Sequence, residues 1–222
     1  MKDVVLDTET TGLSVKDGHR IVEIGCIELD DFVITNNVFH CYLNPERKVS
    51  ESAFKVHGYT DEFLSKQKKF TNIAKKFLEF IDGKNIIIHN ADFDLSHLNN
   101  ELSIAGLPKI KKENITDTLE IARDKFPGSS VSLDALCKRF RIDNSKREKH
   151  NAIIDCKLLA KVYVNLLDQK EPLFNFLEPH KVIKNVDSKK KINHSKKIIT
   201  ASEEEINLHK LFLKNNLKKN YF

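Results

Sequence analysis

Residues 4–12 read Val-Val-Leu-Asp-Thr-Glu-Thr-Thr-Gly, an apolar run that passes directly into two acidic residues. The run predicts a strand, and because strand side chains alternate between faces, Asp7 and Glu9 should point the same way. Two like charges held so close repel each other, and a divalent cation removes that conflict. Carboxylate oxygens suit Mg²⁺ or Mn²⁺. The feature therefore predicts a metal site at the end of a strand; the alternative is a strand that runs out into a polar turn at Thr11-Gly12.

The segments that follow alternate between strand and helix patterns. Strand patterns cover residues 4–6, 20–30, 32–43, 85–88 and 114–117, and Asn36-Asn37 could mark a kink or a bulge in the third. After a polar stretch, helical patterns cover residues 60–81, 92–105, 119–125, 132–140 and 152–167. Strands first, and then strands that alternate with helices, predict an α/β fold in which helices flank a mixed β-sheet.

The last quarter of the chain has a different composition. Residues 181–222 hold 11 lysines against four acidic residues, whereas the first 180 residues hold 26 basic and 28 acidic residues. Periodicity is lost after Leu167, which predicts a flexible linker, and Ser202 then caps a new helix with an apolar side. A lone amphipathic helix cannot bury that side by itself, so it should dock on a partner. We expect a domain over 1–168, a linker over 169–200 and a helical tail over 201–222.

The sequence also limits where the protein works. Its four cysteines are scattered without a CxxC pair, which favours buried free thiols in a reducing compartment over zinc or a disulfide framework. No apolar run reaches membrane-spanning length, and Met1-Lys2-Asp3 leads straight into the first strand without a signal peptide. We therefore expect a cytoplasmic protein without a membrane partner.

Two further carboxylates fall on the inward faces of predicted helices. Asp94 lies at the edge of an apolar stripe, and Asp155 shares its face with Leu159 and Val162. A buried carboxylate without a partner costs several kcal/mol, in order of magnitude, or becomes neutral. A salt bridge to a basic side chain is the alternative. Together with the two acids of the first strand, however, these residues favour a two-metal site.

His150 precedes Asp155 by five residues in a polar segment. This segment predicts a loop, with Asn151 or a neighbour capping the following helix. A histidine beside a metal site, with an ordinary pKa near ~6.5, is suited to take a proton from water. The alternative is a surface histidine without a chemical role.

Three motifs, DTETTG at 7–12, HNADFD at 89–94 and HNAIID at 150–155, resemble in order and spacing the DEDD superfamily of 3′–5′ exonucleases. The histidine five residues before the last aspartate is typical of the DEDDh branch. The resemblance implies a ribonuclease H-like fold for the domain and His150 as the general base. It also implies two divalent cations, Mg²⁺ or Mn²⁺, held by Asp7, Glu9, Asp94 and Asp155. The final Asp of HNADFD is the ligand in this pattern, so Asp92 is expected to cap its helix.

The same resemblance suggests how a substrate binds. Thr10, Thr11 and Gly12 would let the backbone approach the terminal nucleotide, which Asp7, Glu9 and Asp155 would contact as well. In the segment VSESAFKVHG at 49–58, His57 matches a nucleotide contact of relatives. Ser52 stands where some relatives have a glutamate, which puts that contact in doubt. The expected substrate is a single-stranded or frayed 3′ end of DNA.

Within the superfamily, the C-terminal part resembles the proofreading subunits of bacterial DNA polymerase III. Gln169, Leu173 and Phe174 match a short motif that binds the sliding clamp, and residues 199–213 resemble the tail that docks on the polymerase (alpha) subunit. A small theta-like subunit is a further expected partner. Two alternatives stay open: an exoribonuclease of the ribonuclease T or oligoribonuclease kind, and a catalytically idle subunit that only braces a polymerase.

Overall fold

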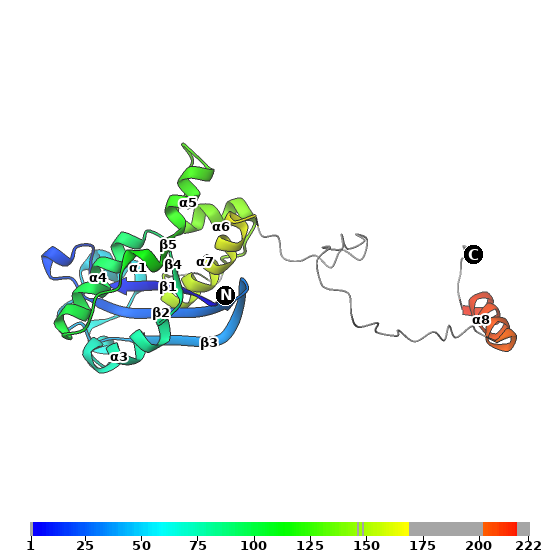
Figure 1. Ribbon diagram of the computed structural model, residues 1–222, viewed down its shortest axis with the longest axis horizontal. Coiled ribbons are helices and arrows are strands. Elements are labelled where there is room, and N and C mark those ends of the chain that lie inside the picture. Colours follow the sequence, from blue (N-terminus) through cyan, green and yellow to red (C-terminus); the bar gives the residue numbers. More distant parts are fainter. Residues whose placement is uncertain (1, 146, 148, 169–201, 217–222) are drawn as a thin grey trace, which may run out of the picture. The chain divides into compact units, whose positions relative to one another are not determined.

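The computed structural model describes residues 2–145, 147, 149–168 and 202–216, which fall into two units, 1–175 and 176–222. The first unit contains a five-stranded sheet with the order β3-β2-β1-β4-β5 (Figure 1). Its strands are β1 Lys2–Thr10, β2 Ile21–Asp30, β3 Val33–Tyr42, β4 Asn85–Ile88 and β5 Ile115–Asp117. β1 pairs antiparallel with β2 and parallel with β4, so the predicted mixed sheet is confirmed.

Helices cover both faces of this sheet. The α-helices described in this unit are α1 Glu51–His57, α2 Asp61–Ser65, α3 Phe70–Ile81, α4 Ala91–Ile104, α5 Thr118–Lys125, α6 Leu133–Phe140 and α7 Ala152–Leu166. Val4 and Leu6 of β1 face a core formed with α3 and α4, whereas Val5 faces a core formed with α7. α3 and the group α5 to α7 accordingly lie on opposite sides of the strands (Figure 1). The alternation of β1 side chains thus divides the domain into two layers of helices.

Two local differences from the sequence expectations have simple causes. The stretch 44–59 contains α1, which was not predicted because His57 is its single buried residue and no apolar periodicity marks it. Ser50 caps this helix by accepting a hydrogen bond from Ala53 N–H, and Gly58 ends it at φ 77°. The helical pattern of residues 60–81 is two helices, α2 and α3. The predicted irregularity at Asn36-Asn37 is confirmed, since β2 and β3 shift register there.

The second unit contains α8, Glu203–Asn216. It begins where Ser202 predicts it, and Ser202 Oγ accepts a hydrogen bond from Glu205 N–H while the Glu205 carboxylate accepts one from Ser202 N–H. Its side chains Ile206, Leu208, Leu211 and Phe212 are exposed. The predicted linker 169–200 lies outside the described residues, as does the clamp motif of Gln169, Leu173 and Phe174.

All four cysteines are free thiols, and Cys26, Cys137 and Cys156 are buried, as expected. In the described part of the chain, none of the helices is both long enough and apolar enough to cross a membrane.

Candidate metal and catalytic site

A cavity of about 310 Å³ lies beside the carboxyl ends of β1 and β4, the edge at which open α/β sheets place their ligands. It is lined by Asp7, Thr8, Glu9, His89, Asn90, Phe93, Asp94, Ser132, Leu133, Asp134, Arg147, His150 and Asp155. The five residues predicted to bind metal or to act as the base all line it, although they come from segments up to 148 positions apart in the sequence.

The four carboxylates reach the cavity from both sides of the sheet. Asp7 and Glu9 share the face of β1 that carries Val5, so they point toward α7, where Asp155 occupies the first turn. Asp94 comes from the first turn of α4, on the other side of the sheet. Thr8, on the opposite face of β1, donates a hydrogen bond from Oγ1 to Asp94 Oδ1 at 2.7 Å and holds it at the strand end. Both helices therefore present their first turns, where negative charge is favoured, to the cavity.

The turn into α4 differs from the sequence expectation. Asn90 has φ 72°, a left-handed backbone conformation, and the Asp117 carboxylate accepts hydrogen bonds from Asn90 N–H and Ala91 N–H at 3.0 and 2.9 Å. The Asp117 carboxylate thus accepts hydrogen bonds from the backbone N–H groups at the start of α4, which have no partner within the helix. The predicted cap role of Asp92 is wrong, because its exposed side chain forms an ion pair with Lys112.

The carboxylates strongly perturb one another. Burial raises the pKa of Glu9 to about 8, and the charges of Asp155, Glu23 and Asp94 add to this effect. Burial also raises the pKa of Asp94 to about 7, against the hydrogen bond from Thr8. The pKa of Asp7 is raised well above its ordinary value by burial and by Asp94, Glu9 and Asp155. Such a cluster carries more negative charge than its neighbours neutralise.

This donor set fits divalent cations. Glu9, His150 and Asp155 each offer one ligand atom, and these atoms lie within 4.8 Å of one another. Asp7 and Asp94 add further carboxylate oxygens to the same cavity, and hard oxygen donors suit small divalent cations. Cations bound here would favour the ionised form of every carboxylate whose pKa is raised.

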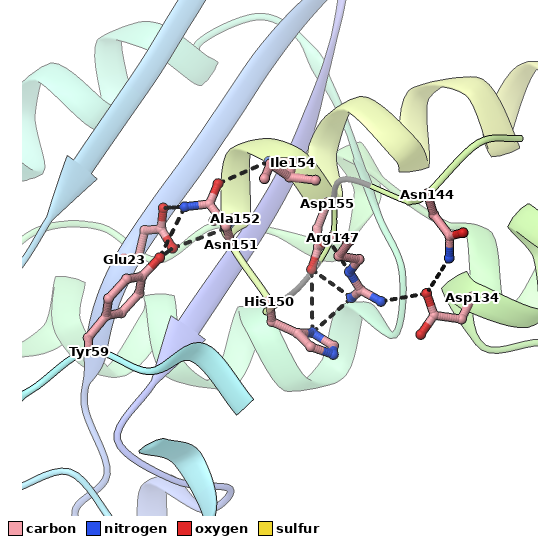
Figure 2. A network of polar contacts seen from close by, with 10 residues as sticks. All are labelled: Glu23, Tyr59, Asp134, Asn144, Arg147, His150, Asn151, Ala152, Ile154 and Asp155. Atoms are coloured by element: carbon pink, nitrogen blue, oxygen red, sulfur yellow. Dashed lines mark hydrogen bonds and ion pairs between the residues drawn. The ribbon is translucent and has the colours of Figure 1, made fainter. Parts of the chain in front are cut away.

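Arg147 is a cavity residue that the sequence analysis missed. Its Nε and Nη2 donate to the two oxygens of Asp155 at 2.5 and 2.7 Å, and its Nη1 donates to Asp134 at 2.7 Å (Figure 2). The salt bridge considered as the alternative for Asp155 is therefore present, inside the carboxylate cluster itself. The available signal was the basic-rich segment Lys-Arg-Glu-Lys at 146–149, directly before His150, which indicates the region but not which side chain folds inward.

His150 lies in the loop before α7, as predicted, and Asn151 caps that helix by accepting a hydrogen bond from Ile154 N–H at 3.1 Å. Arg147 Nη2 lies 2.8 Å from His150 Nδ1, and a guanidinium can only donate, so Nδ1 is the acceptor. Nδ1 also lies 3.4 Å from Asp155 Oδ2, which places the ring beside the carboxylates.

The other predicted substrate residues do not line this cavity; they are Thr10, Thr11, Gly12, Ser52 and His57. Thr10 Oγ1 donates to Gly12 O at 2.7 Å, and the Thr11 side chain is fully buried. His57 is buried and stacks on Tyr59, whereas Ser52 is exposed on α1. Their contact with a nucleotide remains a prediction.

Known proteins share both the sequence and the fold. A family model described as exonuclease matches residues 4–163. DNA polymerase III subunit epsilon of Rickettsia conorii is 45% identical over 227 residues, which cover 100% of this chain and 99% of that protein. DNA polymerase III subunit epsilon of Haemophilus influenzae is 38% identical over 98% of this chain and 91% of that protein.

Among solved structures, the nuclease domain of 3′hExo, a DEDDh family member bound to rAMP, superposes with a TM-score of 0.63 at 19% identity. The match covers 76% of this chain and 92% of that chain. Exonuclease X in complex with 5′ overhanging duplex DNA superposes with a TM-score of 0.58 at 24% identity, covering 75% and 91%. These likenesses confirm the ribonuclease H-like fold.

The chain therefore belongs to the exonuclease family defined by this fold and motif set. Within that family it belongs with the epsilon subunits of DNA polymerase III, because the likeness extends over its full length, tail included.

Proposed function

We propose that this chain is the metal-dependent 3′–5′ exonuclease that proofreads DNA during bacterial replication. It would remove mismatched 3′-terminal nucleotides as nucleoside 5′-monophosphates. The observation that carries the proposal is the convergence of four carboxylates and His150 on one cavity in a chain that resembles epsilon subunits from end to end. A purely structural subunit would not need the four carboxylates and the histidine, which speaks against the idle-subunit alternative. The C-terminal tail speaks against the exoribonuclease alternative.

Asp7, Glu9, Asp94 and Asp155 would hold two divalent cations, Mg²⁺ or Mn²⁺. When bound, such a pair stabilises the attacking and leaving oxygens of a phosphoryl transfer. His150 would accept a proton from the attacking water at Nδ1, the ring nitrogen that holds the lone pair in this structure. The water oxygen then bonds to phosphorus, the bond to the 3′ oxygen of the preceding nucleotide breaks, and that oxygen takes up a proton from solvent. Arg147 must release Nδ1 before that atom can accept a proton.

The terminal nucleotide would lie over the end of β1. At Gly12 a Cβ would lie 2.3 Å from the His19 ring, so this glycine lets His19 pack against the turn, and hydrogen bonds within the turn hold the side chains of Thr10 and Thr11. His57 and Ser52 on α1 would border the nucleotide from the neighbouring segment. The slightly acidic domain favours a frayed 3′ end delivered by the polymerase over tight binding of free DNA.

The partners follow from the second unit and the linker. The exposed apolar side chains of α8 support docking of the tail on the polymerase (alpha) subunit. Gln169, Leu173 and Phe174 would bind the sliding clamp, and a small theta-like subunit would bind the domain. These assemblies act on the chromosome, so the cytoplasm is the proposed location.

The test is hydrolysis of a 5′-labelled single-stranded DNA oligonucleotide and its RNA counterpart with Mg²⁺, with Mn²⁺ and with chelator. We expect a metal-dependent ladder that shortens from the 3′ end, with DNA cut far faster than RNA. A preference for RNA would instead place the chain with the exoribonucleases. The absence of cleavage with either metal would support the idle-subunit alternative.

A further inference from the structure

Glu23 of β2 is a fully buried carboxylate beside the cavity that is not part of its lining. It lies directly opposite Glu9 in the register of β1 and β2. Each of its two carboxylate oxygens already accepts two hydrogen bonds. Oε1 accepts from His40 Nε2 at 2.7 Å and Asn151 Nδ2 at 2.8 Å, and Oε2 accepts from Tyr59 OH at 2.8 Å and Ala152 N–H at 3.1 Å. A carboxylate that already accepts four hydrogen bonds is unavailable to a cation, so the role of Glu23 differs from that of Glu9.

Two of the four donors to Glu23, the Asn151 side chain and the Ala152 N–H, belong to the start of α7. Ala152 N–H is the first amide of that helix and has no partner within it. Asn151 donates its side-chain amide to Glu23 and also to Tyr59 OH at 3.0 Å, while its Oδ1 caps the helix. Glu23 therefore fixes both the position and the rotation of the first turn of α7.

That turn carries the catalytic parts of the proposed site. His150 directly precedes Asn151, and Asp155 is three residues after Ala152. In Figure 2, Asn151 and Ala152 contact Glu23 and Tyr59, whereas the adjacent His150 contacts Arg147 and Asp155. A small displacement at Asn151 would thus move the base and a metal ligand together.

Gly25 on the same strand shows how closely α7 approaches β2. A Cβ at this position would lie 2.7 Å from the carbonyl carbon of Ala152, a distance that backbone atoms cannot accommodate without moving. Gly25 is also the register partner of Asp7. The start of α7 therefore has a tightly defined place on the strand that borders β1.

We propose that Glu23 is a positioning residue that acts through Asn151 and Ala152 to set His150 and Asp155 against Asp7 and Glu9. The expected effect on the rate of hydrolysis rests on the proposed nuclease function, whereas the placement of the start of α7 by Glu23 does not depend on it. Tyr59 extends the same network to the segment that holds His57, so the base and the predicted nucleotide contact share one anchor.

Glu23→Gln is the direct test, because an amide can accept through one oxygen only and turns its own N–H groups toward donors. We expect kcat on the single-stranded oligonucleotide to fall about 10²-fold, the scale of a roughly 1 Å misplacement, with KM within about threefold of the unchanged protein. Tyr59→Phe removes one of the four donors and should lower kcat several-fold without preventing folding.

Glu28→Gln is the matched control. Glu28 is also buried on β2, and it pairs with Lys2 and Lys84 away from the cavity. It should lower the Tm but keep kcat within about twofold, a change of less than ~0.5 kcal/mol. Equal losses of kcat in Glu23→Gln and Glu28→Gln would overturn the proposal, as would full kcat in Glu23→Gln.

Amide hydrogen exchange gives a second readout that does not depend on activity. In Glu23→Gln, the amides of residues 152–155 should exchange faster, while Glu28→Gln leaves them unchanged. Unchanged exchange in Glu23→Gln would overturn the proposal even in an active enzyme. If the unsubstituted protein cleaves no nucleic acid with either metal, the nuclease function fails, and the exchange experiment still decides whether Glu23 holds the start of α7.

Discussion

Arg147 and Asp155 form a two-point ion pair in the lining of the cavity, with guanidinium nitrogens 2.5 and 2.7 Å from the two carboxylate oxygens. Their side chains are only 7% and 3% exposed. A cation that uses the Asp155 oxygens must share or displace this guanidinium. Because Arg147 also donates to His150 Nδ1, its displacement would free the proposed base at the same time.

Arg147→Gln should therefore bind Mn²⁺ more tightly, since no ion pair has to be broken. We expect a gain of about tenfold, or ~1.4 kcal/mol, by titration calorimetry. In chelator the same variant should be less stable by about 3–5 kcal/mol, because Asp155 is left buried without its partner.

Arg20→Gln is the matched control for this experiment. Arg20 binds both oxygens of the buried Glu101 at 2.6 and 2.8 Å, and neither residue lines the cavity. It should lower stability without a change in Mn²⁺ affinity. Weaker Mn²⁺ binding by Arg147→Gln would show that the guanidinium assists cation binding and does not compete with it.

The raised pKa values of Glu9, about 8, and Asp94, about 7, make stability in chelator depend on pH. Unfolding returns these groups to ordinary values of 4.5 and 3.8, so above those values the folded protein keeps protons that the unfolded chain releases. Their contribution is fully present below the unfolded pKa values and is lost as pH rises through 7 and 8.

We therefore expect the Tm in chelator to fall from about pH 5 to about pH 8.5 through this linkage. Saturating Mn²⁺ should remove most of the fall, because bound cations favour the ionised carboxylates. Asp94→Asn should flatten the chelator profile, since one titrating group is absent. A chelator profile that rises over the same range would contradict the assigned pKa directions.

Asp94 and Asp92, two positions apart on α4, test whether the loss of activity is specific to the proposed metal ligand or follows from the loss of any acidic side chain on this helix. Asp94→Asn should lower kcat by about 10³-fold or more, on the scale of losing a charge-stabilising group, as should Asp7→Ala and Asp155→Ala. Asp92→Asn, two positions away and paired with Lys112 on the surface, should keep full activity. Steady-state hydrolysis with Mg²⁺ measures this, and circular dichroism checks folding. Retained activity in Asp94→Asn would exclude it as a ligand.

His150→Ala should lower kcat by about 10²–10⁴-fold, the usual range for loss of a general base, with a much smaller change in Mn²⁺ affinity. The remaining activity should increase with hydroxide concentration, because solution then supplies the base. His209→Ala is a suitable control histidine, since His209 is exposed on α8 and does not line the cavity. A normal rate across neutral pH in His150→Ala would remove it as the base.

Deletion of residues 181–222 should leave the oligonucleotide activity intact but abolish co-purification with the polymerase subunit. The domain core is complete without the tail, because α7 ends at Leu166. Leu211→Asp, within the exposed apolar residues of α8, should reproduce the loss of binding without a deletion. A truncated protein that still binds the polymerase would show that the tail is not the tether.

The sequence motifs named the four carboxylates and His150 as candidate site residues because the signal for each of them lies within a short stretch of sequence. An apolar run that ends in Asp7 and Glu9, or a carboxylate on an apolar helix face, is visible within ten residues. The order of strands and helices was accessible for the same reason. Helix α1 was not, because a short exposed helix is set by its Ser50 cap and carries no apolar period.

The sequence by itself therefore determined the class of fold, the metal-binding acids as candidates, and the place of His150 in a loop before a capped helix. Only the tertiary structure decided that Asp117 and not Asp92 starts α4, that Arg147 folds onto Asp155, and that Glu23 anchors α7. For Asp117 and Glu23 the physical reason is distance along the chain, because they accept hydrogen bonds from segments 26 and 129 residues away. Arg147 is only eight residues from Asp155, but it lies in a loop whose sequence has no periodicity to indicate which basic side chain folds inward.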